Sequence, residues 1–331
     1  MNILAIETSC DETAAAVVKD GIKILSNVVA SSTAMHEKYG GIVPEVAARE
    51  QLRCIIPTIE EAMKPYDAIA VTVGPGLIGS LLVGVETAKT MAMVSGKPLI
   101  PVNHVLAHMY ANFIQSSEKN SSRAQLRDNI TFPAISLVVS GGHTELFLMK
   151  SPKNIKWLGG TLDDAAGEAF DKTARLLGFG SKGGIAIQRV AKRNPNNTKL
   201  PRPLMHDGSL NFSFSGLKTA ILREWQKEKE HKDEYIAGLA YEVQESITDV
   251  LVSKTKAAVG KYNAKSVLIS GGVAANLRLR EKFESVFDNF HCPPVQLCTD
   301  NAVYIASYAY FRGKPVDWHD ITAIPDLAVE I

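Results

Sequence analysis

Two histidines stand four residues apart in the stretch "PVNHVLAHMYANF", at His104 and His108. On a helix this spacing places both side chains on one face, about one turn apart. Two neutral imidazoles arranged in this way can bind a metal ion. A zincin protease also needs a glutamate general base directly after the first histidine, and this chain has Val105 there. The pair therefore indicates either a metal site without proteolysis or two histidines that merely share a helix.

A candidate third ligand is Asp300, in the stretch "CTDNAVYIASYAYF". It lies just ahead of a strongly apolar helix pattern, in a context typical of a helix N-terminus. Two histidines and one carboxylate would leave coordination positions open for a substrate. The spacing along the chain does not by itself bring Asp300 to His104.

The elements around these residues follow a pattern that occurs twice. "NILAIETSCDETAAAVV" and "FPAISLVVSGGHTELFLM" each show an apolar run, a small polar turn and a second apolar run. "YDAIAVTVGPGLIGSLLVG" and "AKSVLISGGVAANLRLREKF" each show a buried strand, a glycine turn and a helix. The repeated pattern predicts two related α/β halves, with the polar stretch "QSSEKNSSRAQLRDN" as a loop or hinge between them.

The two glycine turns also predict a function. Glycine allows a close approach of the backbone to a ligand, and the helix that follows presents free N–H groups there. We therefore predict an anion-binding cleft between the halves. The alternative is that such turns have only a structural role, because they are common in every α/β protein.

Composition limits the class of protein. The chain has 331 residues, 46% of them hydrophobic, which favours two domains with sizeable cores. Its 36 basic and 35 acidic residues give no overall attraction to nucleic acid, so such binding would need a local patch or a partner protein. The four cysteines form no CxxC pair, and no signal peptide or membrane-spanning run is visible. We expect a cytoplasmic protein without membrane contact.

Several motifs together resemble the TsaD family, also known as Gcp. They are "IETSCDETAAAVV", "GGIVPEVAARE", "HVLAH", "VVSGGHTEL", "GEAFDKTARLLG", "NFSFSGLKTA", "SGGVAANLRLR" and "CTDNA". They occur in the expected order from residue 3 to about residue 310, and "GEAFDKTARLLG" is closer to the bacterial branch than to the archaeal one. The resemblance implies two lobes of the actin/Hsp70/sugar-kinase (ASKHA) type around a central cleft. We expect lobes at residues 1–130, completed by 305–331, and at 131–304.

The resemblance also implies an activity. Members of the family transfer a threonylcarbamoyl group from threonylcarbamoyl-adenylate to the exocyclic amine of adenosine 37 in tRNA and release AMP. It implies one divalent metal ion per subunit in the interlobe cleft, held by His104, His108 and Asp300. Fe²⁺ is expected first, with Zn²⁺ or Mg²⁺ as alternatives. Catalytic roles would fall to Asp11 and Glu12, whose acidic turn would take the proton from the attacking amine. The substrate-binding positions would be Val138, Val139, Ser140, Gly141, Gly142, Asp171, Gly184 and Asn276.

The chain departs from the family pattern at three places. The usual Pro-Gly-Gly-Pro is replaced by "SKGGIA", which makes the turn before Gly184 less stiff. Gln51 stands where a histidine is usual, and "DNAVYIA" replaces "DNAAMIA", with Val303 and Tyr304. The proposed metal ligands are unchanged.

The implied partners are tRNA of the ANN-decoding class, a TsaB-like paralogue and a TsaE-like ATPase. For tRNA, the chain offers a segment from residue 172 to 206 without acidic residues. Its cations are Lys172, Arg175, Lys182, Arg189, Lys192, Arg193, Lys199 and Arg202. A solvated basic loop without a partner is the simpler alternative.

Two other functions remain open. A small-molecule kinase of the same fold would use a nucleoside triphosphate with Mg²⁺ and would not need the histidine pair. A non-catalytic scaffold subunit would be expected to have lost the metal residues.

Overall fold

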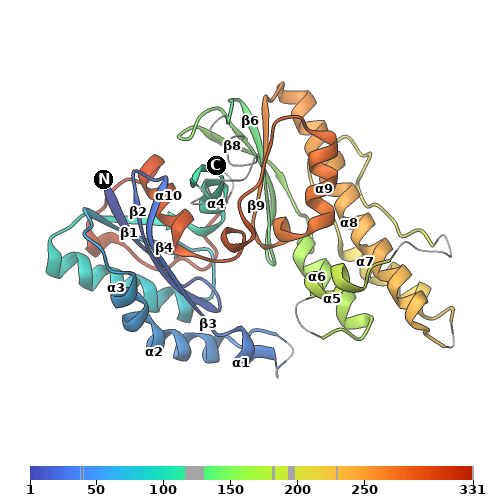
Figure 1. The fold of residues 1–331 in the computed structure, drawn as a ribbon, viewed down its shortest axis with the longest axis horizontal. Helices are drawn as coiled ribbons and strands as arrows, with labels where there is room; N and C mark the ends of the chain where they lie inside the picture. The colour runs from blue at the N-terminus through green and yellow to red at the C-terminus, as the bar shows by residue number, and fades with distance from the viewer. Residues whose placement is uncertain are drawn as a thin grey trace. The chain divides into compact units, whose positions relative to one another are not determined.

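A computed structural model describes residues 1–37, 39, 41–115, 130–180, 183–192, 198–228 and 230–329. The predicted hinge, at residues 115–129, lies outside this description except for its first residue. The chain divides into two compact units (Figure 1). Unit 1 comprises Met1–Asn129 and Pro293–Ile331, and unit 2 comprises Ile130–Cys292. The chain returns to unit 1 earlier than the expected boundary at residue 305, so Asp300 belongs to the same unit as the histidine pair.

Unit 1 is built on a five-stranded mixed sheet in the order β3-β2-β1-β4-β5. The strands β1 and β4 lie inside the sheet and are apolar nearly throughout, as buried parallel strands are. Its strands are β1 (Asn2–Glu7), β2 (Glu12–Lys19), β3 (Lys23–Ser31), β4 (Ala68–Gly74) and β5 (Leu99–Asn103). Its helices are α1 (Thr33–Glu37), α2 (Pro44–Ala62), α3 (Ile78–Ser95), α4 (His104–His108) and α10 (Ala302–Phe311), with 3-10 turns η1 (Met109–Phe113), η4 (Val295–Leu297) and η5 (Trp318–Asp320).

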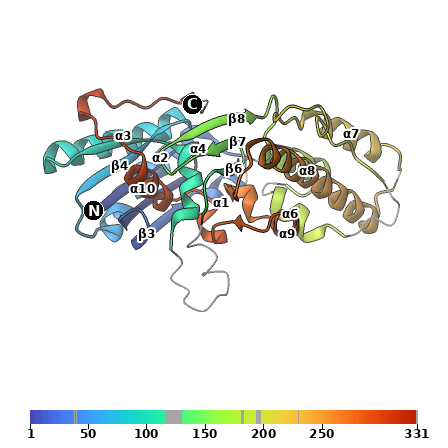
Figure 2. The same ribbon diagram turned by 90° about the horizontal axis from the view of Figure 1, so that it is seen from above.

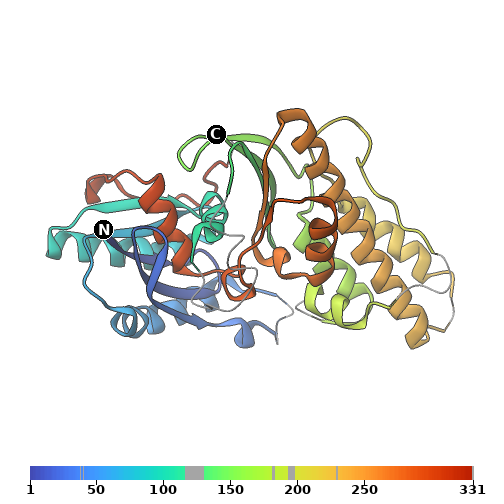
Figure 3. The same ribbon diagram turned by 45° about the horizontal axis from the view of Figure 1, so that its top comes forward.

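The helix α10 forms much of the core of unit 1. Every residue from Ala302 to Ala309 is buried, which explains why this stretch is apolar around its whole circumference. It packs against β1 and β2, whereas α2 and α3 pack together against the sheet (Figures 1 and 3). This late segment of the chain thus packs on the sheet of unit 1, and it places Asp300 in unit 1.

Unit 2 repeats this plan. Its sheet runs β10-β9-β6-β7-β8, which in reverse has the same sequence of parallel and antiparallel pairs as the sheet of unit 1. Its strands are β6 (Ala134–Val139), β7 (Thr144–Met149), β8 (Ile155–Gly160), β9 (Ser266–Ser270) and β10 (Phe290–His291). Its helices are α5 (Ala166–Leu176), α6 (Gly183–Val190), α7 (Ser215–Trp225), α8 (Asp233–Tyr262) and α9 (Leu277–Val286), with the 3-10 turn η3 (Gly272–Ala275). The equivalence of the two sheets confirms the internal repeat.

The long helix α8 organises the helical part of unit 2. It contacts α5, α6 and α9, and Figure 2 shows its course through this unit. Among the described residues, no helix is both long and apolar enough to cross a bilayer.

The two glycine turns differ in what they approach. At Gly74 an added Cβ would lie 1.9 Å from the carbonyl oxygen of Ile324, and at Gly76 it would lie 2.5 Å from that of Ser9. The glycines of the first turn therefore make room for other parts of unit 1, contrary to the anion-binding role that we predicted for them. The second turn, at 271–276, borders a cavity.

Candidate functional site

The histidine pair lies on a single helical turn at the end of β5. The carboxamide of Asn103 caps this turn, because its Oδ1 accepts the backbone N–H of Leu106 at 3.1 Å. The rings of His104 and His108 lie 4.8 Å apart between centroids, and both residues are buried. The predicted one-face arrangement of the pair is present.

Asp300 lies beside this pair. Asn301 caps α10 by accepting the N–H of Val303 at 3.0 Å, and this cap holds the residue before it. The Asp300 Oδ1 lies 3.6 Å from the Nε2 of His104 and 3.6 Å from the Nε2 of His108. The structure thus brings together the three donors that the spacing along the chain could not connect.

Glu7 fixes the orientation of His104. Its Oε2 lies 3.1 Å from the Nδ1 of His104, and the hydroxyl of Thr72 donates to the same oxygen. A proton on Nδ1 leaves the lone pair of Nε2 directed to Asp300, as in the carboxylate–histidine–metal arrangements of known metal sites. Glu7 was not predicted as a site residue, although a glutamate at the end of an otherwise apolar strand indicates a buried polar role.

The electrostatics of this cluster favour a cation. Burial raises the pKa of Asp300, and the charges of Glu7 and Asp11 raise it further, although His104 opposes this. Burial and the neighbouring Asp11 and Asp300 raise the pKa of Glu12 to about 9. Several carboxylates therefore compete for the same proton or cation, and a divalent ion bound by the three donors would relieve their repulsion. The donor set and the charge around it fit a metal ion.

The turn that carries Asp11 and Glu12 is held by Gln51. Its side chain is completely buried, and its Nε2 donates to the carbonyl oxygens of Cys10 at 3.0 Å and Glu12 at 3.1 Å. The departure from the family's histidine thus has a structural role here. In the absence of a cation, the raised pKa makes Glu12 a proton donor at neutral pH.

Unit 2 contains a cavity of about 240 Å³. It is bordered by the β6–β7 turn, the helices α5 and α6, and the second glycine turn. The lining residues are Gly141, Gly167, Phe170, Asp171, Gly184, Ile185, Gln188, Gly272, Val273, Ala275 and Asn276. Four of the eight substrate-binding positions predicted from the sequence are among them: Gly141, Asp171, Gly184 and Asn276.

The other predicted positions have different surroundings. Val138 and Val139 are fully buried within β6 and do not line the cavity. The N–H of Ser140 donates to the carbonyl of His143 at 2.8 Å, so it is not available to cradle a phosphate. In the described part of the chain, the N–H groups of Gly141 and Gly142 have no such partner.

Close packing shapes one wall of the cavity. An added Cβ on Gly183 would lie 2.5 Å from the Cα of Asp171, and the Gly183 N–H donates to the Oδ1 of Asp171 at 2.8 Å. At Gly184 an added Cβ would meet nothing within 4 Å. The glycine that allows α6 to pack closely against α5 is therefore Gly183, which was not predicted from the sequence.

Asn276 caps α9, because its Oδ1 accepts the N–H of Leu279 at 3.0 Å. Its Nδ2 donates to the Oε1 of Gln244 at 3.0 Å. From α6, the Oε1 of Gln188 accepts the N–H of Leu277 at 2.7 Å. The cavity wall at α9 is thus held by three side chains, of which sequence reasoning named one.

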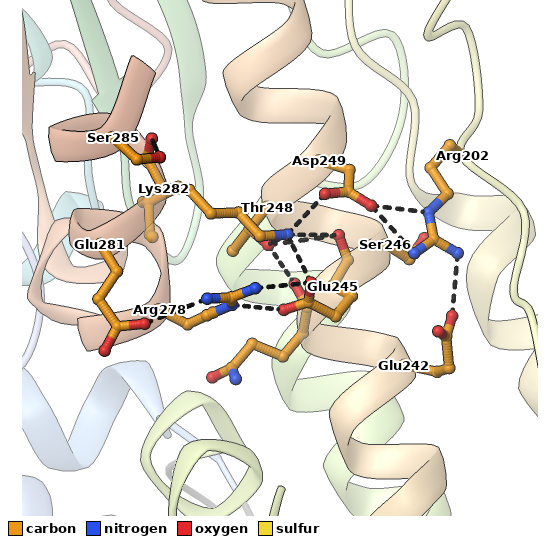
Figure 4. A network of polar contacts seen from close by, with 12 residues as sticks. Arg202, Glu242, Glu245, Ser246, Thr248, Asp249, Arg278, Glu281, Lys282 and Ser285 are labelled. Carbon is orange, nitrogen blue, oxygen red and sulfur yellow. Dashed lines mark hydrogen bonds and ion pairs between the residues drawn. The ribbon is translucent and has the colours of Figure 1, made fainter. Parts of the chain in front are cut away.

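The basic segment is partly neutralised by ion pairs. Lys172 lies 2.6 Å from Asp164, and Arg202 lies 2.9 Å from Glu242 and 3.0 Å from Asp249. Figure 4 shows that Asp249 also contacts Lys282, which together with Arg278 binds Glu245. Lys172 and Arg202 are therefore tied to carboxylates. Arg189, Lys192 and Lys199 are exposed, while Lys182 and Arg193 lie outside the described residues.

The sequence also matches a known protein family. The model of the family "TsaD: tRNA N6-adenosine threonylcarbamoyltransferase" matches residues 23–307. The chain belongs to the TsaD family. The match includes both histidines, Asp300 and all residues that line the cavity.

Relatives in the TsaD family match over nearly the whole chain. A tRNA N6-adenosine threonylcarbamoyltransferase of Persephonella marina is 48% identical over 328 residues, which cover 95% of this chain and 91% of the relative. One of Bacillus subtilis is 46% identical over 320 residues, which cover 93% of this chain and 89% of the relative.

Solved structures confirm the ASKHA fold that the TsaD resemblance implied. HypF from T. kodakarensis is similar with a TM-score of 0.60 at 16% identity, over 93% of this chain and 47% of that one. Component A of the (R)-2-hydroxyglutaryl-CoA dehydratase of Acidaminococcus fermentans is similar with a TM-score of 0.52 at 15% identity, over 94% of this chain and 98% of that one.

Proposed function

We propose that the chain transfers the threonylcarbamoyl group of threonylcarbamoyl-adenylate to the exocyclic amine of adenosine 37 in tRNA, with release of AMP. The observation that carries the proposal is the pairing of His104 and His108 with Asp300 in a chain of the TsaD family. A scaffold subunit without activity would not need these donors. The tRNA substrate would place the protein in the cytoplasm.

The donor would bind through its nucleotide half in the cavity of unit 2. Asp171 lies on this cavity wall and would accept hydrogen bonds from ribose hydroxyls. The N–H groups of Gly141 and Gly142 would contact the phosphate, because a turn of glycines allows the close approach that this requires. Asn276, which caps α9 and donates one amide N–H to Gln244, would contact the ligand through the second N–H of its Nδ2.

A divalent metal ion would be held by His104, His108 and Asp300, with Glu7 orienting His104. Two imidazoles and one carboxylate suit Fe²⁺ or Zn²⁺ better than Mg²⁺, which prefers oxygen ligands. When bound, the metal supplies Lewis-acid polarisation of carbamoyl or phosphate oxygens. Asp11 or Glu12, on the turn next to this site, would receive the proton of the attacking amine. Glu12 could do so only after a bound cation has displaced its own proton.

Partner proteins are part of the proposal. Apolar side chains are exposed on α2 and α3, two helices that pack together. They include Leu52, Ile56, Ile78, Leu82, Met93 and Val94. We propose that a TsaB-like paralogue covers this surface and that a TsaE-like ATPase assists turnover, as the resemblance implies.

The test is AMP release from threonylcarbamoyl-adenylate with tRNA, measured with and without these partners. We expect activity in the wild type, and loss of both metal content and activity in His104→Ala and Asp300→Ala. His319→Ala, which changes an exposed histidine of the same unit, is the matched control. Full metal content and full activity in both site variants would eliminate the proposed site. Phosphate transfer from ATP to a small molecule, without AMP release, would favour the kinase alternative.

A separate measurement addresses the cavity. Asp171→Asn keeps an oxygen that can accept the N–H of Gly183 but removes the charge, so the fold should be retained. We expect weaker binding of AMP by calorimetry, by about tenfold, because a charged acceptor of hydroxyl hydrogen bonds becomes neutral. An unchanged affinity would contradict the role of Asp171.

A further inference from the structure

A buried histidine outside the metal site, His36, lies close to the acidic turn of Asp11 and Glu12. It is on α1, it is almost completely buried, and it belongs neither to the three candidate metal donors nor to the lining of the cavity. The pairing of β2 with β3 places α1 there, because Ser31 at the end of β3 lies opposite Glu12. A buried imidazole is costly unless its nitrogens have hydrogen-bond partners, so the partners of His36 indicate its role.

Both ring nitrogens of His36 have such partners. Nε2 lies 3.1 Å from the Oγ of Ser32, and Nδ1 accepts the backbone N–H of Val43 at 3.3 Å. The hydroxyl of Ser32 donates its single proton to the carbonyl oxygen of Asp11 at 2.7 Å, so toward His36 it can only accept. Nε2 of His36 therefore carries a proton and Nδ1 does not, which fixes one neutral tautomer.

The contact with Val43 selects this tautomer. Val43 is the N-cap residue of α2, and its N–H can only donate, so it keeps the proton on the nitrogen that faces Ser32. The helix α2 also holds the acidic turn directly, because Gln51 donates to the carbonyl oxygen of Glu12 at 3.1 Å. The backbone of the turn thus has two supports, Ser32 and Gln51, and His36 orients the first of them.

The same segment holds the side chains of the turn. The hydroxyl of Thr33, the first residue of α1, donates to Oδ2 of Asp11 at 3.1 Å, and the hydroxyl of Ser31 donates to Oε1 of Glu12 at 3.2 Å. A shift of this segment would therefore redirect both carboxylates. A proton acceptor must lie within about 2.6–3.2 Å of the atom that gives up the proton, so such a shift lowers the rate of a reaction that depends on it.

We propose that His36 is a positioning residue for the acidic turn, and that it sets where Asp11 and Glu12 meet the proton of the attacking amine. This inference rests on the proposed function, in which one of these carboxylates receives that proton. His36 would act through Ser32 and would not touch the substrate. Its loss should therefore slow the transfer without changing how tightly the substrates or the metal bind.

A pair of amide substitutions separates the two contacts of the ring. In His36→Gln the side-chain Nε2 takes the place of the imidazole Nε2, and it always donates, so the contact with Ser32 is kept without the help of Val43. In His36→Asn the Oδ1 takes the place of Nδ1, so the contact with Val43 is kept and that with Ser32 is lost. His36→Phe keeps an aromatic ring and loses both contacts.

AMP release in the presence of tRNA and the partner proteins, measured over a range of adenylate concentrations, gives kcat and KM for each variant. We expect kcat to fall about 10–100-fold in His36→Asn and in His36→Phe, but by less than about threefold in His36→Gln. KM and metal content should equal those of the wild type in all three. Thermal unfolding gives the folded fraction to which each activity is referred. A purely structural histidine would change that fraction without this order of kcat values.

The outcomes separate this inference from the proposal on which it rests. Equal kcat values in His36→Gln and His36→Asn would overturn the role of His36, and so would a raised KM at unchanged kcat. The double variant Asp11→Asn/Glu12→Gln tests the proton acceptor itself. If it keeps the kcat of the wild type, this step of the proposed function is wrong, and the role of His36 with it. If it loses activity while His36→Asn and His36→Phe keep theirs, only the role of His36 is wrong.

Discussion

At the scale of single residues, the candidate metal site depends on side chains that do not bind the metal. Glu7 receives hydrogen bonds from the N–H of Ser9, the hydroxyl of Thr72 and the Nδ1 of His104. All three donors converge on two carboxylate oxygens. In the sequence, Glu7 is only the last residue of a predicted strand. The fold shows that its contact with Nδ1 of His104 leaves Nε2 facing Asp300.

Replacement of Glu7 by glutamine should therefore weaken metal binding. A carboxamide presents an N–H₂ group to one of the three donors, so His104 must change its tautomer or its orientation. At about pH 9, where protons compete little for His104, we expect metal affinity to fall about 10–100-fold, as for other residues that hold a metal ligand in place. A chelator competition measures this, with Glu61→Gln, an exposed change on α2, as control. Equal affinities in the two variants would contradict the orienting role.

Metal affinity should also depend on pH. Burial alone would lower the pKa of His104, but the charges of Glu7 and Asp300 outweigh it and raise the pKa to about 9. At neutral pH the metal must therefore displace a proton from His104. We expect the affinity for Zn²⁺ to rise about tenfold per pH unit from about pH 7 to about pH 9, and then to level off.

Titration calorimetry at several pH values measures this slope. In Glu7→Gln the pKa of His104 loses its main upward contribution, so the rise should level off at lower pH. A metal affinity that does not change with pH would show that His104 is already neutral in the metal-free protein.

At the scale of elements, the cavity of unit 2 depends on how closely α5 and α6 approach. The family resemblance named Gly184 of the glycine pair. The structure shows that Gly183 makes the contact, because its missing side chain lets the backbone of α6 lie against that of α5. Sequence spacing cannot distinguish two adjacent glycines, since helix phase and the position of a second helix decide which one faces its neighbour.

Alanine substitutions at Gly183 and Gly184, made one at a time, should show which glycine makes the contact between α5 and α6. In Gly183→Ala the new methyl group meets backbone, which cannot move aside, so α6 must shift. We expect the free energy of unfolding to fall by about 1–3 kcal/mol and AMP binding to weaken. In Gly184→Ala the methyl group has open space, and the helix gains propensity, so stability should be unchanged or slightly higher. Thermal unfolding and calorimetry on both variants measure this. A similar loss in both variants would contradict the assignment of the contact to Gly183.

The sequence predicted more of the fold than of the site's details. Strand–turn–strand patterns at two places predicted two equivalent sheets, because hydrophobic periodicity follows directly from burial. The three candidate metal donors could be named from the sequence, but their proximity could not be predicted. It depends on contacts of α10 with β1 and β2, which lie nearly 300 residues earlier in the chain. Gln51 and Tyr304 appeared only as departures from a family pattern. Their partners became visible only with three-dimensional contacts.

At the scale of the whole molecule, recognition of tRNA must be local, because the net charge is only +1. The exposed Arg189, Lys192 and Lys199 are the described cations of the basic segment that are best placed to reach phosphates. The ion-paired Lys172 and Arg202 are less suited, since their carboxylate partners would have to be displaced.

Neutralisation of Arg189, Lys192 and Lys199 together should weaken tRNA binding and flatten its dependence on salt. Each cation that contacts a phosphate adds about one unit to the slope of log affinity against log salt concentration. Adenylate binding should be unchanged. The control is neutralisation of Lys256, Lys261 and Lys265, exposed cations of unit 2 outside the segment. A filter-binding titration in the presence of the partners decides, and equal slopes for the two triple variants would place the tRNA elsewhere.

The division of the chain into a continuous and a split unit has a consequence for biosynthesis. Unit 2, Ile130–Cys292, is contiguous, so it can fold as soon as its last strand has left the ribosome. Unit 1 must wait for its second segment, because α10 is buried against strands that were synthesised first. Asp300 emerges with that segment, about 200 residues after His104. The nascent chain therefore carries the finished cavity of unit 2 before Asp300 can join the two histidines, so the candidate metal site is completed later than the cavity.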